Sequence, residues 1–371
     1  MKVIAFYLPQ YHEIPENNKW WGKGFTEWVN VKKAKPLFEG HYQPRIPLNN
    51  NYYDLSDNSV MDWQISIAKK YGVYGFCFYH YWFDGHMLLQ KPVEAFLRNK
   101  KQDMPFCICW ANEHWTNAWV SKKNTVLIEQ RYGGKKEWKE HFDYLLQYFK
   151  DPRYIKNNNN KPLFVVYRPE LIDCLNPMLD YWQELAKENG FAGMEFAYQH
   201  VSYLLHPNRD DSRFTYNIEY EPIYAQSLMA QKRFPKLRKL KREVAEFAEK
   251  KLNIDIRHVT DTKLVHYSYD EVWQYILNMS PSTSMAIPGA FVDWDNTPRR
   301  GDKGTLYDGV TPEKFHKYMS AQIKRAKDVY HQDMLFIFAW NEWAEDGYLE
   351  PDEKRKYGML EALKAALEEN Q

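Results

Sequence analysis

The chain has 371 residues, and 44% of them are hydrophobic, so a large core can be buried and global disorder is excluded. Fifty Lys and Arg residues against 49 Asp and Glu leave a formal net charge of +1, which argues against non-specific nucleic-acid binding as the main function. Apolar runs such as residues 73–82 and 335–340 are too short to span a bilayer, and no secretory signal precedes the first apolar run, so we expect a cytoplasmic protein.

Short apolar runs, typical of strands that are buried on both faces, recur along the whole chain. We predict strands at residues 3–8, 75–79, 106–110, 163–167, 195–198, 216–220, 289–292 and 335–340. Helical patterns lie between most of them, at 60–71, 177–190, 269–279, 312–329 and 358–369. Asp57 or Ser59 can cap the first of these helices, while Asn176-Pro177 and Thr311-Pro312 each combine a capping residue with Pro at the first helical position.

This alternation of strands and helices predicts a closed (β/α)8 barrel that forms a single domain over residues 1–371. The alternative is an open doubly wound sheet, but Leu8-Pro9-Gln10-Tyr11 stands where such a sheet has a Gly-rich phosphate loop. The aromatic connection over residues 9–58 is expected to form an ordered loop on the catalytic face.

A second long connection, over residues 225–270, is expected to form a basic helical insertion in the barrel. Its positive charges concentrate between Lys232 and Arg242. This segment is either a solvated helix face or a peripheral contact with an anionic membrane surface or a phosphorylated carrier.

The chain contains four cysteines, Cys77, Cys107, Cys109 and Cys174. Four are too few for a disulfide scaffold, and the Cys-x-Cys pair lacks the second pair that a zinc site needs. We therefore expect reduced thiols in the core.

Aromatic residues make up 17% of the chain, and many tryptophans stand at or just past the ends of predicted strands. These are Trp82, Trp110, Trp115, Trp119, Trp294, Trp340 and Trp343. Core packing would explain any one of them. Together they favour a glycan-binding surface, because indole faces pack well on the apolar C–H patches of sugar rings.

In such a barrel, reactive residues lie at the carboxyl ends of the strands. Polar residues are dense at these positions, and a polyhydroxylated oligosaccharide or polysaccharide would explain them. The residues predicted to bind substrate are Tyr7, Gln10, Tyr11, His80, Tyr81, Trp82, Trp110, Asn112, Glu113, Tyr167, Arg168, His200, Glu219, Tyr220, Asp293, Trp294, Asp295, Asn296, Arg299, Asn341 and Trp343.

Glu342 and Glu345 follow the last predicted strand, and their spacing places both on one face if the loop makes a helical turn. Cleavage of a glycosidic bond needs two carboxyl groups around one sugar: one protonates the departing oxygen, and the other acts as nucleophile or base. Trp340 and Trp343 can supply an apolar wall that raises the pKa of one of them. We therefore predict that Glu342 and Glu345 are catalytic.

Other residues offer alternatives to this pair. Glu113 is either a rival acid or a hydrogen-bond partner for substrate hydroxyls, and Asp293 and Asp295 can bind hydroxyls as well. Arg299 and Arg300 can hold a loop or bind a phosphate or carboxylate.

Metal and serine chemistry have little support in the sequence. The histidines that follow predicted strands, His12, His80, His114 and His200, lack the spacing of metal ligands. No Gly-x-Ser-x-Gly elbow is present, so neither a metal, another cofactor nor a serine nucleophile is expected.

Six ordered motifs over about residues 1–350 resemble the WbsX-like proteins of bacterial O-antigen and surface polysaccharide clusters, which are often described as glycosyltransferases. The motifs are Tyr-Leu-Pro-Gln-Tyr-His at 7–12, Trp-Gly-Lys-Gly-Phe-Thr-Glu-Trp at 21–28, Tyr-His-Tyr-Trp at 79–82, Trp-Ala-Asn-Glu at 110–113, Trp-Asp-Asn-Thr-Pro-Arg at 294–299 and Trp-Asn-Glu-Trp-Ala-Glu at 340–345. The chain is also similar to the endo-α-mannosidases and endo-α-mannanases of glycoside hydrolase family 99, which are (β/α)8 barrels.

The resemblance implies roles for the two glutamates, because Asn341-Glu342-Trp343-Ala344-Glu345 corresponds to the hydrolases' Asn-Glu-Trp-His-Glu. Glu342 would act as the base on the sugar 2-hydroxyl to give a 1,2-anhydro sugar, and Glu345 as general acid and then base. Ala344 departs from the hydrolase motif, which leaves the substrate open.

A retaining hydrolase or transglycosylase is favoured over a nucleotide-sugar glycosyltransferase of O-antigen or lipopolysaccharide biosynthesis. The only Asp-x-Asp match is Asp293-Trp294-Asp295, whose central Trp suits a sugar platform more than a metal triplet. A non-catalytic glycan-binding barrel is a further alternative.

Overall fold

The computed structural model describes residues 1–116, 125–201, 209–233 and 263–371, with the side chains of 231–233 not included. Trp119 and most of the basic segment between Lys232 and Arg242 lie outside the described residues. No helix in the described part of the chain has the length and apolar character needed to traverse a bilayer.

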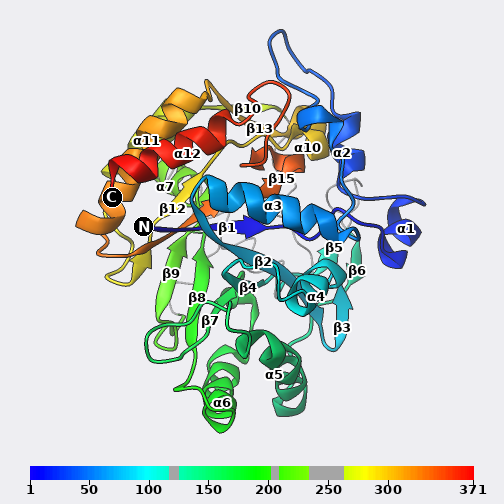
Figure 1. Ribbon diagram of the computed structural model, residues 1–371, viewed down its shortest axis with the longest axis vertical. Coiled ribbons are helices and arrows are strands. Elements are labelled where there is room, and N and C mark those ends of the chain that lie inside the picture. The colour runs from blue at the N-terminus through cyan, green and yellow to red at the C-terminus, as the bar shows by residue number, and fades with distance from the viewer. Residues whose placement is uncertain (117–124, 202–208, 234–262) are drawn as a thin grey trace.

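Nine parallel strand segments form a nearly closed barrel at the centre of the molecule (Figure 1). They are β1 (Lys2–Tyr7), β2 (Val73–Phe83), β4 (Phe106–Trp110), β7 (Leu163–Val166), β8 (Glu195–His200), β9 (Tyr216–Glu219), β11 (Ala286–Ile287), β12 (Gly289–Phe291) and β14 (Met334–Phe338). All eight predicted strands are present. There are nine segments because β11 and β12 together occupy one position in the barrel: β11 pairs with β9, and β12 pairs with β14. The (β/α)8 prediction is confirmed, and the open-sheet alternative is wrong.

Gly289 allows the two ends of this barrel to meet. A Cβ atom at this position would lie 1.7 Å from the carbonyl oxygen of Glu219. Only glycine therefore permits β12 to approach the end of β9 so closely.

Helices surround the barrel in Figure 1. They are α3 (Asn58–Lys70), α4 (Lys91–Arg98), α5 (Lys135–Phe149), α6 (Leu175–Glu188), α7 (Ile223–Arg233), α9 (Tyr269–Asn278), α11 (Pro312–Asp328) and α12 (Gly358–Glu369). In the connection between β8 and β9, the described residues 201 and 209–215 contain no helix.

Two of the predicted helix caps are confirmed. The side chains of Asp57 and Thr311 accept hydrogen bonds from the N–H groups of Ser59 and Lys314. The predicted cap at Asn176 is wrong: α6 begins at Leu175, two residues before the predicted start at 177, and the Asn176 amide donates instead to Asp210.

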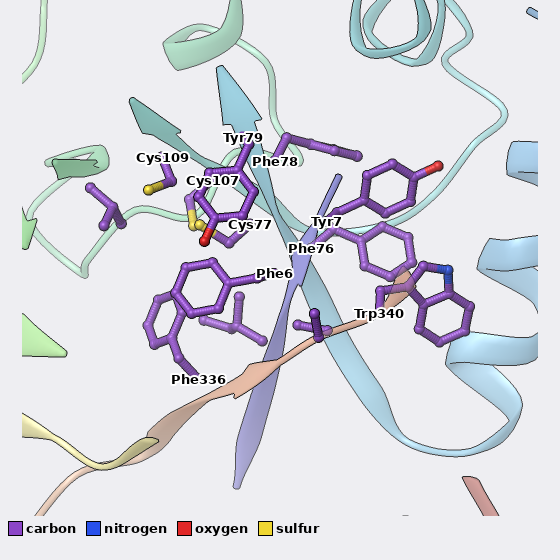
Figure 2. Packing of buried hydrophobic residues seen from close by; sticks show 14 of the residues in the cluster. Phe6, Tyr7, Phe76, Cys77, Phe78, Tyr79, Cys107, Cys109, Phe336 and Trp340 are labelled. Carbon is purple, nitrogen blue, oxygen red and sulfur yellow. The ribbon is translucent and has the colours of Figure 1, made fainter. Parts of the chain in front are cut away.

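Successive residues of each barrel strand point to opposite sides, as Figure 2 shows for β1 and its neighbours. Phe6 packs on Tyr79 and Phe336 inside the barrel, with ring centroids 5.7 and 5.5 Å apart. Tyr7 points the other way, toward Phe76 and the surrounding helices. All four cysteines are free. Cys77, Cys107 and Cys109 are buried in the core as expected, but Cys174 is only partly buried.

Candidate active site

One arginine binds both predicted catalytic glutamates at the carboxyl end of the barrel. Arg299 lies on the short helix α10 (Thr297–Arg300), which follows β12. Its Nη1 donates to Oε1 of Glu345 at 2.7 Å, and its Nη2 donates to Oε1 of Glu342 at 3.1 Å. Both carboxylates are buried. Because the two bind one guanidinium, they lie close enough to flank a single sugar.

A third carboxylate completes this group. Oε2 of Glu27 accepts hydrogen bonds from Nη2 and Nε of Arg299 at 3.1 and 3.3 Å. Glu27 was not among the predicted site residues, although it lies in the motif at 21–28. We call Arg299, Glu27, Glu342 and Glu345 the catalytic cluster.

The turn that carries the two glutamates is held from two sides. It comprises β15 (Asn341–Glu342) and the 3-10 helix η5 (Trp343–Glu345). The Tyr11 hydroxyl donates to the carbonyl oxygen of Asn341 at 2.8 Å and accepts the N–H of Trp343 at 3.1 Å. The Trp343 indole donates to the buried carboxylate of Glu350 at 2.7 Å. These bonds fix the turn, so Tyr11 and Trp343 support the glutamates directly.

Asn341 joins this turn to the first strand. Its side-chain oxygen accepts the N–H of Leu8 at 2.8 Å, and its amide donates to the Leu8 carbonyl at 3.1 Å. The predicted role for Asn341 was substrate binding, but both polar atoms of its side chain are used to connect the ends of β14 and β1.

Burial raises the pKa of Glu342 to about 8, and the negative charges of Glu345 and Glu27 act in the same direction, while Arg299 opposes them. Burial therefore favours the protonated form of Glu342 in the free protein, whereas the family resemblance assigns the role of acid to Glu345. Because the two carboxyl groups share Arg299, the proton is best described as belonging to the pair.

Several predicted residues line the barrel interior next to this pair. Burial raises the pKa of Tyr81 and Tyr220, and the charge of Glu342 acts in the same direction on both. The Gln10 amide donates to the Tyr81 hydroxyl at 2.6 Å. The rings of Tyr167 and Trp294 pack on this wall, against Tyr220 and Phe338 respectively.

Other predicted residues point outward, toward the helices. His80 and His141 face each other across β2 and α5 with their Nε2 atoms 3.0 Å apart, and burial lowers the pKa of His80 to about 3. Trp82 stacks on His141, and the Trp110 indole donates to the Trp82 carbonyl at 3.1 Å. These side chains fasten α5 to the barrel.

Three predicted residues on other strands also point outward, away from the barrel interior. The Tyr7 hydroxyl donates to Gln64 on α3 at 2.7 Å. Glu219 accepts the Tyr330 hydroxyl at 2.6 Å and the N–H of Ser282 at 2.7 Å. His200 lies within hydrogen-bonding distance of Ser282, 3.3 Å away. All three contact the shell around the barrel.

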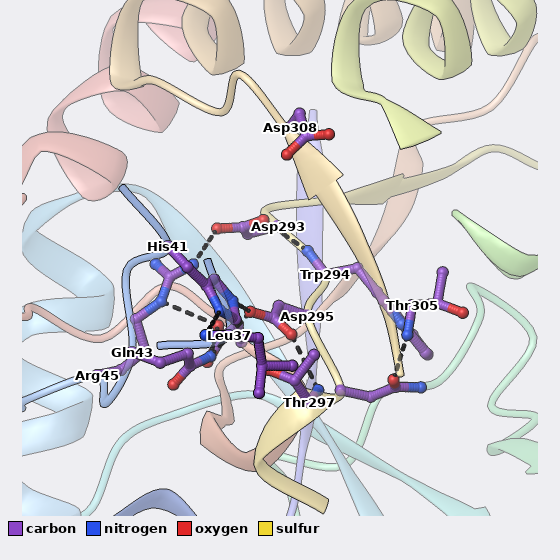
Figure 3. Close-up of polar contacts among 12 residues, drawn as sticks. Leu37, His41, Gln43, Arg45, Asp293, Trp294, Asp295, Thr297, Thr305 and Asp308 are labelled. Atoms are coloured by element: carbon purple, nitrogen blue, oxygen red, sulfur yellow. Dashed lines mark hydrogen bonds and ion pairs between the residues drawn. The ribbon is translucent and has the colours of Figure 1, made fainter. Parts of the chain in front are cut away.

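Asp293 and Asp295 belong to a second buried ion cluster, which Figure 3 shows. Oδ2 of Asp293 binds Arg45 at 3.0 Å and Arg355 at 2.8 Å. Oδ2 of Asp295 accepts hydrogen bonds from His41 at 2.7 Å and Gln43 at 2.9 Å.

Asp346 joins the same cluster through Nε of Arg45 at 2.9 Å and the amide of Gln43 at 2.7 Å. We call these three aspartates, with Arg45 and Arg355, the aspartate cluster. Neighbouring Asn296 accepts the N–H of Thr305 at 2.8 Å. Its side-chain oxygen therefore holds the loop that leads to β13 (Thr305–Asp308).

The rival acid Glu113 has different surroundings from those of the glutamate pair. It is 37% exposed and forms an ion pair with Arg168, which also binds Glu170. The side-chain amide of Asn112 donates to the carbonyl of Arg168, and its side-chain oxygen accepts the N–H of Arg168, both at 2.7 Å. Glu113 is thus paired and partly solvated, unlike the buried glutamate pair.

Within the described residues, no three His, Cys, Asp or Glu side chains are grouped in a way that could hold a metal ion.

Comparison with known proteins gives a family and a fold. Residues 3–363 match the model of the family described as Glycosyltransferase WbsX. Two curated relatives from Xanthomonas campestris pv. campestris, strains ATCC 33913 and B100, are each called uncharacterized protein WxcX and are 34% identical over 369 residues. The match covers 98% of this chain and 49% of each relative, so the chain spans about half the length of the curated relatives it matches.

Among solved structures, a GH99 endo-alpha-mannosidase from Bacteroides thetaiotaomicron in complex with BIS-TRIS-Propane matches with a TM-score of 0.55 and 14% identity, over 100% of this chain and 97% of that one. A glycoside hydrolase-like protein matches with a TM-score of 0.57 and 10% identity, over 98% of this chain and 93% of that one. At these identities the match establishes a shared barrel fold.

Proposed function

The chain belongs to the WbsX glycosyltransferase family, and from this premise we propose that it is an enzyme that breaks and re-forms α-glycosidic bonds. Its substrate is a mannose-type glycan or a bacterial surface polysaccharide, and it acts as a retaining hydrolase or transglycosylase. The observation that carries this proposal is the pair of buried glutamates bridged by Arg299 at the carboxyl end of the barrel. The likeness to a GH99 endo-alpha-mannosidase supports the choice of linkage.

The proposed reaction divides the work between the two glutamates. The Glu342 carboxylate removes the proton of the sugar 2-hydroxyl while that oxygen attacks the anomeric carbon, and Glu345 protonates the departing oxygen as its bond to that carbon breaks. The product is a 1,2-anhydro sugar. A water or sugar hydroxyl then opens it: Glu345 takes the proton of the incoming hydroxyl, and Glu342 returns its proton to the 2-oxygen.

These roles place one proton on Glu345 when the substrate is bound. In the free protein, burial favours the protonated form of Glu342. Binding of the 2-hydroxyl next to Glu342 must therefore shift the proton of the pair toward Glu345. Arg299 contacts both carboxylates and can balance the remaining charge on either one.

Incubation with a panel of α-mannosides, α-mannans and bacterial polysaccharides tests the function. We expect cleavage or transfer with retained anomeric configuration, measured by NMR on early products, and a loss of about 10²–10⁴ in rate for Glu342→Gln and for Glu345→Gln. Inverted products, or full rates in both variants, would contradict the proposal.

The family description favours a second candidate, a glycosyltransferase with a nucleotide-sugar donor. Such a donor brings a diphosphate, but Arg299 is already bound by three carboxylates. Product formation that requires a nucleotide sugar, and that fails with every preformed glycan of the panel, would establish this candidate instead.

Leaving-group chemistry tests the division of roles. Glu345→Gln should be rescued by an aryl glycoside with an acidic leaving group, because that group needs no protonation. Glu342→Gln should stay slow on the same substrate, because the 2-hydroxyl still lacks its base. Equal rescue of both variants, or full-rate cleavage of a 2-deoxy substrate by the unmodified enzyme, would overturn the assignment.

A further inference from the structure

Glu27 is held by the catalytic arginine in a side-on arrangement. Its Oε2 atom accepts hydrogen bonds from both Nε and Nη2 of Arg299, at 3.3 and 3.1 Å. Glu27 stands at the N-cap position of α2 (Trp28–Lys33) without a side-chain capping bond, and the side-chain amide of Asn30 donates to its Oε2 at 3.1 Å. The Glu27 side chain is only 12% exposed. A buried carboxylate that engages this edge of the guanidinium fixes the direction of the remaining N–H bonds.

Those remaining N–H bonds point at the two catalytic glutamates. With Nε and one hydrogen of Nη2 directed to Glu27, the other Nη2 hydrogen serves Glu342 and Nη1 serves Glu345. Glu27 thus orients the arginine. It also adds a negative charge to a site where one cation already faces two carboxyl groups.

Among the described residues, the charges that act most strongly on Glu342 are those of Arg299, which donates to it, and of Glu345 and Glu27. The nearby hydroxyls of Tyr11, Tyr81 and Tyr220 stay neutral, because burial raises the pKa of each well above its usual range. Lys33 of α2 faces Glu27, and burial lowers the pKa of this lysine while Glu27 opposes that effect. Removing the Glu27 charge should therefore lower the pKa of Glu342.

We propose that Glu27 is a positioning residue of the active site, which orients Arg299 toward both glutamates and whose negative charge favours the protonated form of the glutamate pair. This inference rests on the proposed function for its catalytic meaning. Its physical content, the coupling between Glu27 and the protonation of Glu342, does not depend on which glycan is the substrate.

An infrared titration of the whole protein tests the coupling without any substrate. The carbonyl band of a protonated carboxyl group, assigned by its loss in Glu342→Gln, should disappear as pH rises. In Glu27→Gln the midpoint should fall by about one pH unit, because a neighbouring negative charge is lost and Arg299 is freed to stabilise ionised Glu342. Glu39→Gln, a change at an exposed site on the same loop, should leave the midpoint unchanged. A Glu27→Gln midpoint equal to that of the unmodified protein overturns the proposal.

A second variant separates charge from geometry, and covers the case in which Glu27→Gln fails to fold. Glu27→Asp keeps the charge but withdraws it from Arg299, so the band midpoint should stay within about half a pH unit of the unmodified protein. A fall as large as the one expected for Glu27→Gln would contradict the charge-based part of the proposal.

The pH dependence of turnover gives the catalytic readout. The loss of kcat/KM at high pH reports loss of the proton from the pair, so Glu27→Gln should move this limb down by about one pH unit. Glu27→Asp should lower kcat and leave the limb in place. A uniform loss at every pH in Glu27→Gln indicates a merely structural role and overturns the proposal. Failure of the proposed function would show as no turnover at all, while the infrared result would still stand.

Discussion

The catalytic cluster and the aspartate cluster are two buried groups of charges that meet between adjacent residues, Glu345 and Asp346. In the aspartate cluster, Arg45 and Arg355 face three carboxylates that also accept bonds from neutral donors. In the catalytic cluster, one arginine, Arg299, forms ion pairs with all three carboxylates. Both clusters follow the same strands, so the number of cations per carboxylate, and not the presence of acids, distinguishes them.

The neutral donors of the aspartate cluster complete this contrast. The N–H of Leu37 donates to Nδ1 of His41 at 3.1 Å, so the ring hydrogen lies on Nε2 and points to Asp295. The backbone N–H of Asp295 in turn donates to the Glu345 carbonyl at 2.9 Å. We infer that the aspartate cluster, in which two arginines bind the carboxylates, is a scaffold that holds the catalytic cluster in place.

The largest effect on stability should come from Arg45. In Arg45→Met, the buried carboxylates of Asp293 and Asp346 lose a cation, which should lower the free energy of unfolding by about 3–5 kcal/mol. Denaturant unfolding measures this. Arg131→Met is the control, because its ion pair with Glu129 is exposed and should cost less than about 1 kcal/mol. Similar losses in both variants would remove the distinction between a scaffold and a surface pair.

A pH-dependent effect should come from Glu342. Its pKa is raised from 4.5 to about 8 in the folded protein, so its contribution to stability is complete below pH 4.5 and is lost as pH rises toward 8. Glu342→Gln should therefore unfold less readily than the unmodified protein at pH 8, by roughly 2–4 kcal/mol, since one pKa unit is worth about 1.4 kcal/mol. Thermal unfolding from pH 4 to pH 8 measures this, and parallel curves for the two proteins would contradict the raised pKa.

A smaller effect should come from the support of the catalytic turn. Trp343→Phe removes the N–H that donates to buried Glu350, which should cost about 1–3 kcal/mol. Tyr11→Phe removes the hydroxyl that binds the backbone of the same turn and should cost a similar amount. Urea unfolding measures both losses. If neither variant lost stability, the turn would be held by other contacts.

The barrel was largely predictable, because strands buried on both faces leave continuous apolar runs and helix caps such as Asp57 and Thr311 are local signals. The glutamate pair was predictable for the same reason, since one motif after one strand carries both residues. The substrate-binding set was predicted less selectively, because it took consecutive residues at strand ends. A strand sends every second side chain inward, so Tyr81 reaches the site while His80 and Trp82 pack under α5.

Glu27 and the aspartate cluster could not be located from local pattern. Glu27 comes from the long connection over residues 9–58, and the fold alone brings it to Arg299, 272 positions away along the chain. Asp293 and Asp295 follow a strand as substrate-binding residues would. Only the tertiary structure reveals that Arg45 and His41, from that same connection, already bind the carboxylates of these two aspartates.

The most direct test of this contrast is a matched comparison of Glu345→Gln and Asp293→Asn, with turnover and thermal unfolding measured on each. Glu345→Gln should lose about 10²–10⁴ in rate and unfold at the same temperature as the unmodified protein or higher. Asp293→Asn should unfold at a lower temperature, because Arg45 and Arg355 lose their shared partner, and should retain turnover within about tenfold per folded molecule. Retained turnover in Glu345→Gln, or an equal loss of turnover in folded Asp293→Asn, would contradict the assignment of one cluster to chemistry and the other to structure.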